Sequence, residues 1–123
     1  FDPELFTTQN TREMAEEVIR EKCFEFLHQE VPFGLAVQIR KFDESQDNIT
    51  RIYADIILSK DNHRSMVLGQ KGAKIKMIGT AARKEIEKFH PKKLFLDLHV
   101  SVKKNWMKQN QLMKELGYVV REP

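Results

Sequence analysis

The sequence holds very little cysteine and no long apolar run, and these shortages exclude several classes of protein. Cys23 is the only cysteine among 123 residues, so the chain can form neither an intramolecular disulfide nor a cysteine metal cluster. A lone thiol also favours a reducing compartment. No apolar stretch approaches the length of a membrane span. With 41% hydrophobic and 32% charged residues, the chain is typical of one globular domain with its own core.

The motifs of several enzyme classes are also missing. The sequence contains no P-loop of the type G-x-x-x-x-G-K-S/T, no G-x-G-x-x-G and no H-E-x-x-H. Asp55 and Asp97 are predicted on one face of a sheet, but nothing marks them as an acid–base pair. The histidines lie in separate predicted elements without ligand spacing, and each is interpreted as a surface or structural residue: His28, His63, His90 and His99. We therefore expect no catalytic residue and no metal site.

The net charge of +3 hides a strong asymmetry between the two halves of the chain. Residues 1–62 carry 7 Lys and Arg against 13 Asp and Glu, which gives a net charge of −6. Residues 63–123 carry 14 against 5, a net charge of +9, so the two halves sum to +3. A segregated basic half of this kind indicates a polyanionic partner such as nucleic acid.

The basic half contains a short glycine motif, Gly69-Gln70-Lys71-Gly72, followed by a lysine-rich helical pattern. Glycine permits a tight turn and removes the side chain that would hold another backbone away. We expect the turn to open into a helix whose first N–H groups and positive dipole end point outward. Lys71, Lys74 and Lys76 add full positive charges, so the stretch is suited to a phosphodiester backbone. On its spacing alone, a G-x-x-G motif also fits a plain corner between two helices.

Alternating apolar residues predict three strands and hence an α+β fold. The strands are expected at residues 35–40, 51–58 and 94–102, and a turn at 45–48 joins the first two as an antiparallel hairpin. The third strand follows a helical crossover, so it can pair parallel to an earlier strand. The sequence therefore predicts a three-stranded mixed sheet with helices packed on one face.

Four helices are predicted around these strands. The first begins with Asn10 as its cap and runs to His28, and a short one ends at Leu68. A long helix follows the glycine turn and a last helix covers residues 106–116. The apolar face of the long helix is expected at Ile75, Ile78, Ala82, Ile86 and Phe89.

Apolar side chains beside the glycine turn complete a binding hypothesis. A KH module clamps four nucleotides of backbone on a G-x-x-G loop, and an apolar groove beside the loop can then receive the bases. Val67, Leu68, Ile75 and Ile78 are the candidates to line or support such a groove. Ile75 lies one turn into the long helix and is the better groove candidate, whereas Ile78 is better interpreted as core.

Five stretches of the sequence carry a family resemblance. The longest is VLGQKGAKIKMIG at residues 67–79. It is joined by AEEVIREK at 15–22, EVPF at 30–33, and a C-terminal pair, VKKNW at 102–106 with LGY at 116–118. These stretches extend from about residue 10 to residue 120, nearly the whole chain. Together they resemble the KH part of the Era family of GTPases.

The resemblance implies a type II KH fold that binds single-stranded RNA near the 3′ end of small-subunit ribosomal RNA, during assembly of the small ribosomal subunit. By position, the backbone clamp would be formed by Gly69, Gln70, Lys71 and Gly72. Leu68, Lys74 and Ile75 would lie beside the clamp, and the third strand would border the base groove.

The resemblance also implies a larger parent protein. Residues 1–10 are expected to be the linker or tail from a missing GTPase domain, and residues 11–123 the type II KH domain. GTP and magnesium would bind that missing domain, so we expect no cofactor and no enzyme activity in this fragment. A monomer in the bacterial cytoplasm is the default expectation, with the mitochondrial matrix or another organelle as the alternative. Peripheral membrane association is implied for some parents of the family.

Two other functions remain open from the sequence. The glycine turn could pack against a partner protein, which would make the chain an interaction or regulatory module. Alternatively, the chain could be the KH domain of another RNA-binding protein, such as a ribosomal protein or a transcription factor. Trp106 and the LGY stretch at 116–118 argue against that second alternative. The bases that are read cannot be predicted, because base-edge contacts depend on groove geometry.

Overall fold

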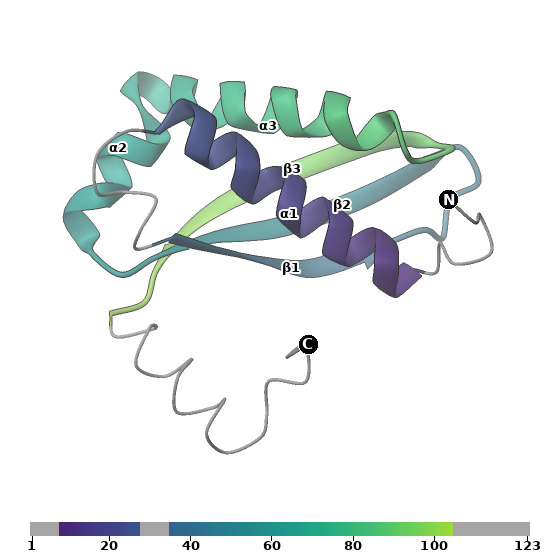
Figure 1. Cartoon of the computed structure of the whole chain (residues 1–123), viewed down its shortest axis with the longest axis horizontal. Coiled ribbons are helices and arrows are strands. Elements are labelled where there is room, and N and C mark those ends of the chain that lie inside the picture. Colours follow the sequence, from purple (N-terminus) through teal and green to yellow (C-terminus); the bar gives the residue numbers. More distant parts are fainter. Residues whose placement is uncertain (1–7, 28–34, 105–123) are drawn as a thin grey trace, which may run out of the picture.

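The computed structural model describes residues 8–27 and 35–104, and it shows an α+β fold built on one three-stranded sheet (Figure 1). The strands are β1 (Leu35–Asp43), β2 (Ile49–Leu58) and β3 (Lys93–Val102), in the spatial order β1-β2-β3. β1 and β2 run antiparallel, whereas β2 and β3 run parallel. The predicted mixed sheet is therefore confirmed. The helix predicted at residues 106–116 lies outside the described residues.

Alternating burial along the strands separates an inner face of the sheet from an outer one. On β2, Ile52 and Ile56 are fully buried, whereas Tyr53 between them is partly exposed. Because successive side chains of a strand point to opposite faces, the buried set of each strand forms one floor for the helices. The largest fully buried apolar side chains are Ile19, Ile52, Ile56, Leu58, Ile78, Ile86 and Val67.

β1 contains a β-bulge between Ile39 and Lys41 that the sequence did not predict. The extra residue reverses the alternation of the side chains. Lys41 therefore stays on the outer face, with its Nζ atom 5.9 Å from the ring centroid of Tyr53. Phe42 packs against the core instead, with its ring edge-on to His90 at 6.4 Å between centroids. The bulge lets β1 continue to Asp43 without burying a lysine charge.

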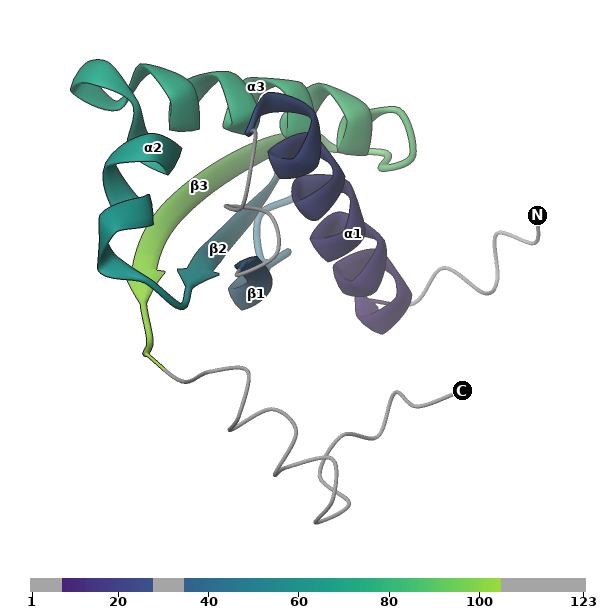
Figure 2. The ribbon, with the colours of Figure 1, turned by 60° about the vertical axis from the view of Figure 1, so that its left-hand side comes forward.

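Two helices, α1 (Thr8–Phe26) and α3 (Ala73–Glu87), cover the inner face of the sheet (Figures 1 and 2). Each contributes a buried stripe at helical spacing, as predicted. The fully buried residues of the two stripes are Ala15, Ile19, Cys23, Ile78, Ala82 and Ile86. α1 begins at Thr8, two residues before the predicted cap Asn10. The segment Thr8–Asn10 contains no proline or glycine, so nothing in its sequence opposes this earlier start.

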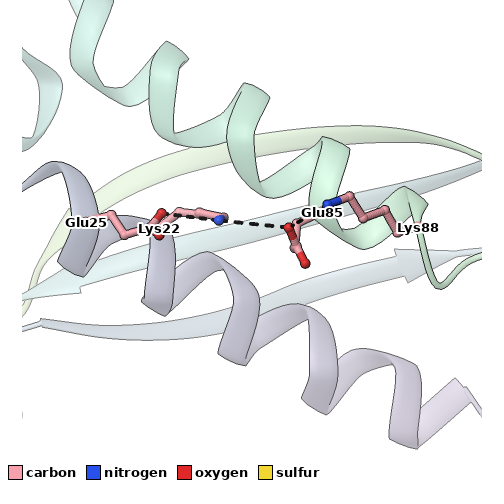
Figure 3. Close-up of polar contacts among 4 residues, drawn as sticks. All are labelled: Lys22, Glu25, Glu85 and Lys88. Atoms are coloured by element: carbon pink, nitrogen blue, oxygen red, sulfur yellow. Dashed lines mark hydrogen bonds and ion pairs between the residues drawn. The ribbon is translucent and has the colours of Figure 1, made fainter.

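An ion-pair cluster joins α1 to α3 (Figure 3). Lys22 of α1 places its Nζ atom 3.2 Å from a carboxylate oxygen of Glu25 and 4.0 Å from one of Glu85 on α3. Lys88 approaches the same Glu85 oxygen at 3.4 Å. The hydrogen bond to Glu25 raises the pKa of Lys22 above its ordinary value. These contacts help to fix the position of α3, which carries the glycine turn at its start.

Phe89 is not a core residue, and the sequence prediction was wrong on this point. α3 ends at Glu87, two residues before Phe89, so the helical spacing that would have turned its ring inward no longer applies. The ring of Phe89 is 55% exposed.

Within residues 8–27 and 35–104, none of the helices has the length and apolar character that crossing a bilayer would need.

Candidate nucleic-acid interface

The glycine motif forms a tight turn between α2 (Arg64–Leu68) and α3. The N–H group of Gly69 donates to the Ser65 carbonyl at 2.9 Å, which closes α2. Gly69 has φ 72° and ψ 179°, a combination that is essentially confined to glycine. A Cβ atom on Gly69 would lie 2.6 Å from the Cβ and 2.8 Å from the backbone nitrogen of Lys74. The turn itself therefore requires glycine here, because the chain passes directly against the start of α3.

The next two turn residues after Gln70 adopt left-handed conformations. Lys71 has φ 55° and ψ 29°, and it is the one non-glycine residue with positive φ in the described part of the chain. Gly72 follows with φ 75° and ψ 15°. A Cβ atom on Gly72 would meet no atom within 4 Å, so the space beside it is open to a ligand. The two glycines thus differ: Gly69 makes the turn possible, and Gly72 leaves it accessible.

The start of α3 is arranged to attract an anion. No side chain caps the helix at Gly72. The N–H groups of Gly72 and Ala73 donate within the turn, to the carbonyls of Gly69 and Gln70. The positive end of the helix dipole lies at this turn. Lys71 and Lys76 are exposed and Lys74 is half-buried. None of these three lysines forms an ion pair with another described residue. The positive end of a helix dipole next to these cations suits a phosphate group.

Two of the four apolar candidates lie at the surface of this turn. Leu68 and Ile75 are partly buried and pack against the core from either side of the turn, as expected for groove residues. Ile78 is fully buried, which confirms its assignment to the core. Val67 is also fully buried, so it can support the groove from the core but cannot line it. The single turn of α2 packs Val67 inward and leaves its neighbour Leu68 nearer the surface.

β3 extends this apolar surface. The sequence predicted that the third strand borders the groove, but it did not single out Leu96 and Leu98, which are half-buried. A Cβ atom on Gly79 of α3 would lie 3.6 Å from Leu98 Cδ1, so helix and strand are in close contact. The alternation of side chains places these two leucines on the inner face of the sheet. How much of their surface stays exposed depends on the position of α3, which the alternation does not give. We call the following four residues the apolar strip: Leu68, Ile75, Leu96 and Leu98.

The position of β3 at the edge of the sheet adds hydrogen-bonding groups to the strip. β3 pairs with β2 on one side, and no described strand pairs with its other side. An unpaired strand edge presents backbone N–H and C=O groups in a regular row. Such groups can bind an extended ligand lying along the strand.

Polar contacts fix the loop between α3 and β3 at the far end of the strip. Glu87 accepts hydrogen bonds through one oxygen from the Leu94 N–H at 3.0 Å and through the other from Arg83 at 3.1 Å. Thr50 Oγ1 and His90 Nε2 share a hydrogen bond of 2.8 Å. Burial lowers the pKa of His90 below its ordinary value. The start of β3 is therefore held against the end of α3.

The other polar residues considered from the sequence form no catalytic arrangement. Asp55 and Asp97 do lie on the outer face of the sheet, but Asp55 is paired with Arg40 at 2.7 Å. Cys23 is buried, and burial raises the pKa of its thiol to about 12, which leaves it unreactive at neutral pH. Among the residues that the structure describes, no group of three His, Cys, Asp or Glu side chains could hold a metal ion.

Comparison with known proteins gives a family for this fold and turn. A family model described as KH domain matches residues 30–107. GTPase Era of Geobacter metallireducens is 41% identical over 119 residues, and GTPase Era of Helicobacter pylori is 38% identical over 121 residues. These matches cover 96% and 98% of this chain but 40% of each relative. The chain thus spans about 40% of the length of the curated relatives it matches.

Two solved structures share the fold at 31% sequence identity. One is a crystal structure of Aquifex aeolicus Era bound to GDP and aluminium fluoride, with a TM-score of 0.76. The other is Era in complex with MgGDPNP and nucleotides 1506–1542 of 16S ribosomal RNA, with a TM-score of 0.77. Each match covers 87% of this chain and 36% of the solved chain. The family resemblance and the fold class predicted from the sequence are thereby confirmed: this chain belongs to the KH domain family and matches the KH part of Era GTPases.

Proposed function

We propose that the chain binds single-stranded RNA, with the turn Gly69–Gly72 holding the sugar-phosphate backbone. The positive dipole end of α3 and the Lys71 ammonium would attract phosphate, and the open space at Gly72 would let the backbone approach. Bases would then lie on the apolar strip, with Lys74 beside the clamp. The exposed edge of β3 would offer backbone groups to their polar edges.

The observation that carries this proposal is the left-handed, uncapped turn beside a half-buried apolar strip. The two parts suit different parts of a nucleotide. The positive start of α3 and the lysines attract phosphate, whereas leucine and isoleucine favour the faces of bases. Single-stranded RNA presents both at once, since its bases are unpaired and can leave the stack. A duplex would present phosphates but keep its bases inside. The solved Era complex with part of 16S ribosomal RNA supports the same class of ligand.

We further propose that the RNA is the 3′ end of small-subunit ribosomal RNA, bound during assembly of the small ribosomal subunit. In this proposal the chain is the RNA-binding part of an Era-like GTPase, and it contributes binding rather than catalysis. GTP and magnesium would bind the part of the parent that this chain does not span. The bacterial origin of the Era relatives supports a bacterial cytoplasmic location, and we expect the fragment to be a monomer.

The proposal can be tested by fluorescence anisotropy with short labelled nucleic acids. A single strand of about eight nucleotides copying a small-subunit rRNA 3′ end would be compared with a scrambled strand and with a duplex of the same length. We expect the single strands to bind more tightly than the duplex, and the rRNA copy more tightly than the scrambled strand.

Equal affinity for duplex and single strand would contradict the use of unpaired bases. Equal affinity for the two single strands would leave RNA binding in place but contradict the proposed rRNA target. No measurable RNA binding at low salt would favour the interaction-module alternative instead.

A further inference from the structure

A cluster of aromatic and cationic side chains lies on the outer face of the sheet, opposite α1 and α3. Tyr53 of β2 and Phe95 of β3 have ring centroids 5.9 Å apart, with an interplanar angle of 58°. The Arg51 guanidinium carbon lies 5.3 Å from the Phe95 centroid, and Lys41 Nζ lies 5.9 Å from the Tyr53 centroid. We call these four residues, drawn from three strands, the aromatic patch.

The strand register and the bulge in β1 bring these residues together. Arg51 lies opposite Phe95 in the parallel pairing of β2 with β3, and Tyr53 lies opposite Lys41 in the antiparallel pairing with β1. Both helices that pack on the sheet lie on its inner face, and no described helix covers the patch (Figures 1 and 2). Phe95 is 39% exposed, which is high for a large apolar side chain.

The side chains of the patch are those that bind unpaired nucleotides. Bases stack on aromatic rings and on guanidinium planes, and nearby cations attract the phosphates between them. Lys93 adds a third cation on the same side of β3. Lys41, Arg51 and Lys93 outnumber the two carboxylates on this part of the face, Asp43 and Asp97. A cross-strand aromatic pair also stabilises a sheet, but that role alone does not call for an exposed ring beneath a cation.

The patch and the glycine turn lie toward opposite ends of β3. Gly79 of α3 lies against Leu98, and Glu87 at the end of α3 binds Leu94, so α3 runs antiparallel to β3. The turn at the start of α3 is therefore near the end of β3, seven residues beyond Phe95. Seven residues of strand span about 23 Å, so an RNA that fills only the four-nucleotide clamp cannot reach the patch.

We propose that the aromatic patch is a second contact for single-stranded RNA, which receives one or two bases of a strand that extends from the clamp past β3. This inference rests on the proposed function and adds a site on the opposite face of the sheet. It predicts that RNA length decides which residues matter. Short strands use the turn alone, whereas longer strands use the turn and the patch.

The test compares single strands of about five and about twelve nucleotides, the first filling the clamp and the second long enough to pass it. Phe95→Leu should weaken binding of the long strand about tenfold and leave the short strand unchanged, because one base loses its stacking partner. Phe24→Leu is the matched control: Phe24 is 46% exposed on α1, and Arg20 lies over its ring at 5.4 Å. The control should leave both affinities unchanged. Arg51→Gln, which keeps both rings, should also weaken only the long strand.

Each other outcome overturns the inference, and the failures can be told apart. Equal binding of the long strand by the Phe95→Leu and Phe24→Leu variants would show that the patch does not contact RNA, while short-strand binding would leave the clamp intact. Equal loss for both lengths would show that Phe95 acts only through the fold, which circular dichroism would also report. If the unchanged protein bound neither strand, the proposed function itself would fail.

Discussion

At the residue scale, Lys71 combines an unfavourable backbone conformation with an exposed positive charge. A left-handed conformation costs a non-glycine residue roughly 1–2 kcal/mol. Such strain persists at sites where the residue serves function. The two neighbouring glycines also divide between structure and function. Gly69 is needed because a side chain there would clash within the turn, whereas Gly72 faces open space.

Lys71→Gly removes both the backbone strain and the positive charge, and the two losses act on different measurements. Glycine adopts the left-handed region without the steric cost but loses more freedom on folding. We therefore expect the free energy of unfolding, measured in urea, to stay unchanged or to rise by up to about 1 kcal/mol. RNA affinity should fall, since a phosphate contact is lost. Lys76→Gly is the control: within the helical backbone of α3, it should lower the free energy of unfolding by about 1 kcal/mol. A large destabilisation by Lys71→Gly would contradict this account.

The two glycines should respond differently to alanine. Gly69→Ala places a Cβ atom 2.6 Å from Lys74 Cβ in a region confined to glycine, so we expect a loss of about 2–3 kcal/mol in the free energy of unfolding. Gly72→Ala meets no atom within 4 Å and should cost only about 1 kcal/mol for its left-handed backbone. Its Cβ would nevertheless occupy the space proposed for the RNA backbone. Urea denaturation and anisotropy would measure both effects, and equal destabilisation by the two changes would argue against the described turn.

At the scale of elements, local patterns predicted most of the secondary structure. The strict alternation of apolar and polar residues predicted β2 and β3, and apolar residues at helical spacing predicted the buried stripe of α3. The bulge at Ile39–Lys41 could not be predicted, because it depends on pairing with β2 rather than on the sequence of β1. Phe89 was misassigned because its spacing continues the apolar stripe although the helix has already ended.

Ile75 and Ile78 lie one turn apart on α3, and replacing them by alanine should affect different properties: RNA affinity for Ile75 and stability for Ile78. Ile78→Ala leaves a cavity in the core, and we expect it to cost about 2–5 kcal/mol in the free energy of unfolding, with little change in RNA affinity of the folded protein. Ile75→Ala removes part of the apolar strip, so it should weaken RNA binding more than it destabilises the fold. Denaturation and anisotropy on both variants would reveal the contrast. If Ile75→Ala left the affinity unchanged, the strip would not receive bases.

The contact between Thr50 and His90 makes the junction of α3 and β3 sensitive to pH. Burial lowers the folded-state pKa of His90, with Lys92 acting in the same direction and Glu44 opposing it. The neutral ring is therefore favoured in the folded state. The stabilisation that neutral His90 gives the fold is complete above the ordinary histidine pKa of about 6.5, and it is lost as the pH falls below that value. We expect the melting temperature to fall between about pH 7.5 and pH 5.5, and His90→Gln to reduce that fall. An identical pH profile for the variant would contradict this role.

At the scale of the whole molecule, only the local part of the site could be predicted from the sequence. The clamp residues are consecutive, so their motif marks them, and the basic half of the chain contains them. Leu96 and Leu98 join the site only because α3 packs beside β3. The aromatic patch draws its residues from three strands, so neither spacing nor composition points to it.

RNA affinity should depend on charge at the glycine turn and not on the basic half of the molecule in general. The most direct measurement is the affinity of the Gln70→Asp/Lys71→Asp double variant for a single-stranded copy of an rRNA 3′ end across a salt series. Its matched control is Thr80→Asp/Lys84→Asp, which makes the same change of charge on the middle and the last turn of α3.

Both pairs replace one neutral residue and one lysine, so each lowers the net charge equally. We expect the turn variant to lose binding while circular dichroism shows an intact fold. The control should keep most of its affinity and a salt dependence close to that of the unchanged protein, which for about four phosphate contacts gives a slope near −3 in log affinity against log salt. Equal weakening of the two variants would contradict the account, because the turn would then contribute no more than its share of the overall charge.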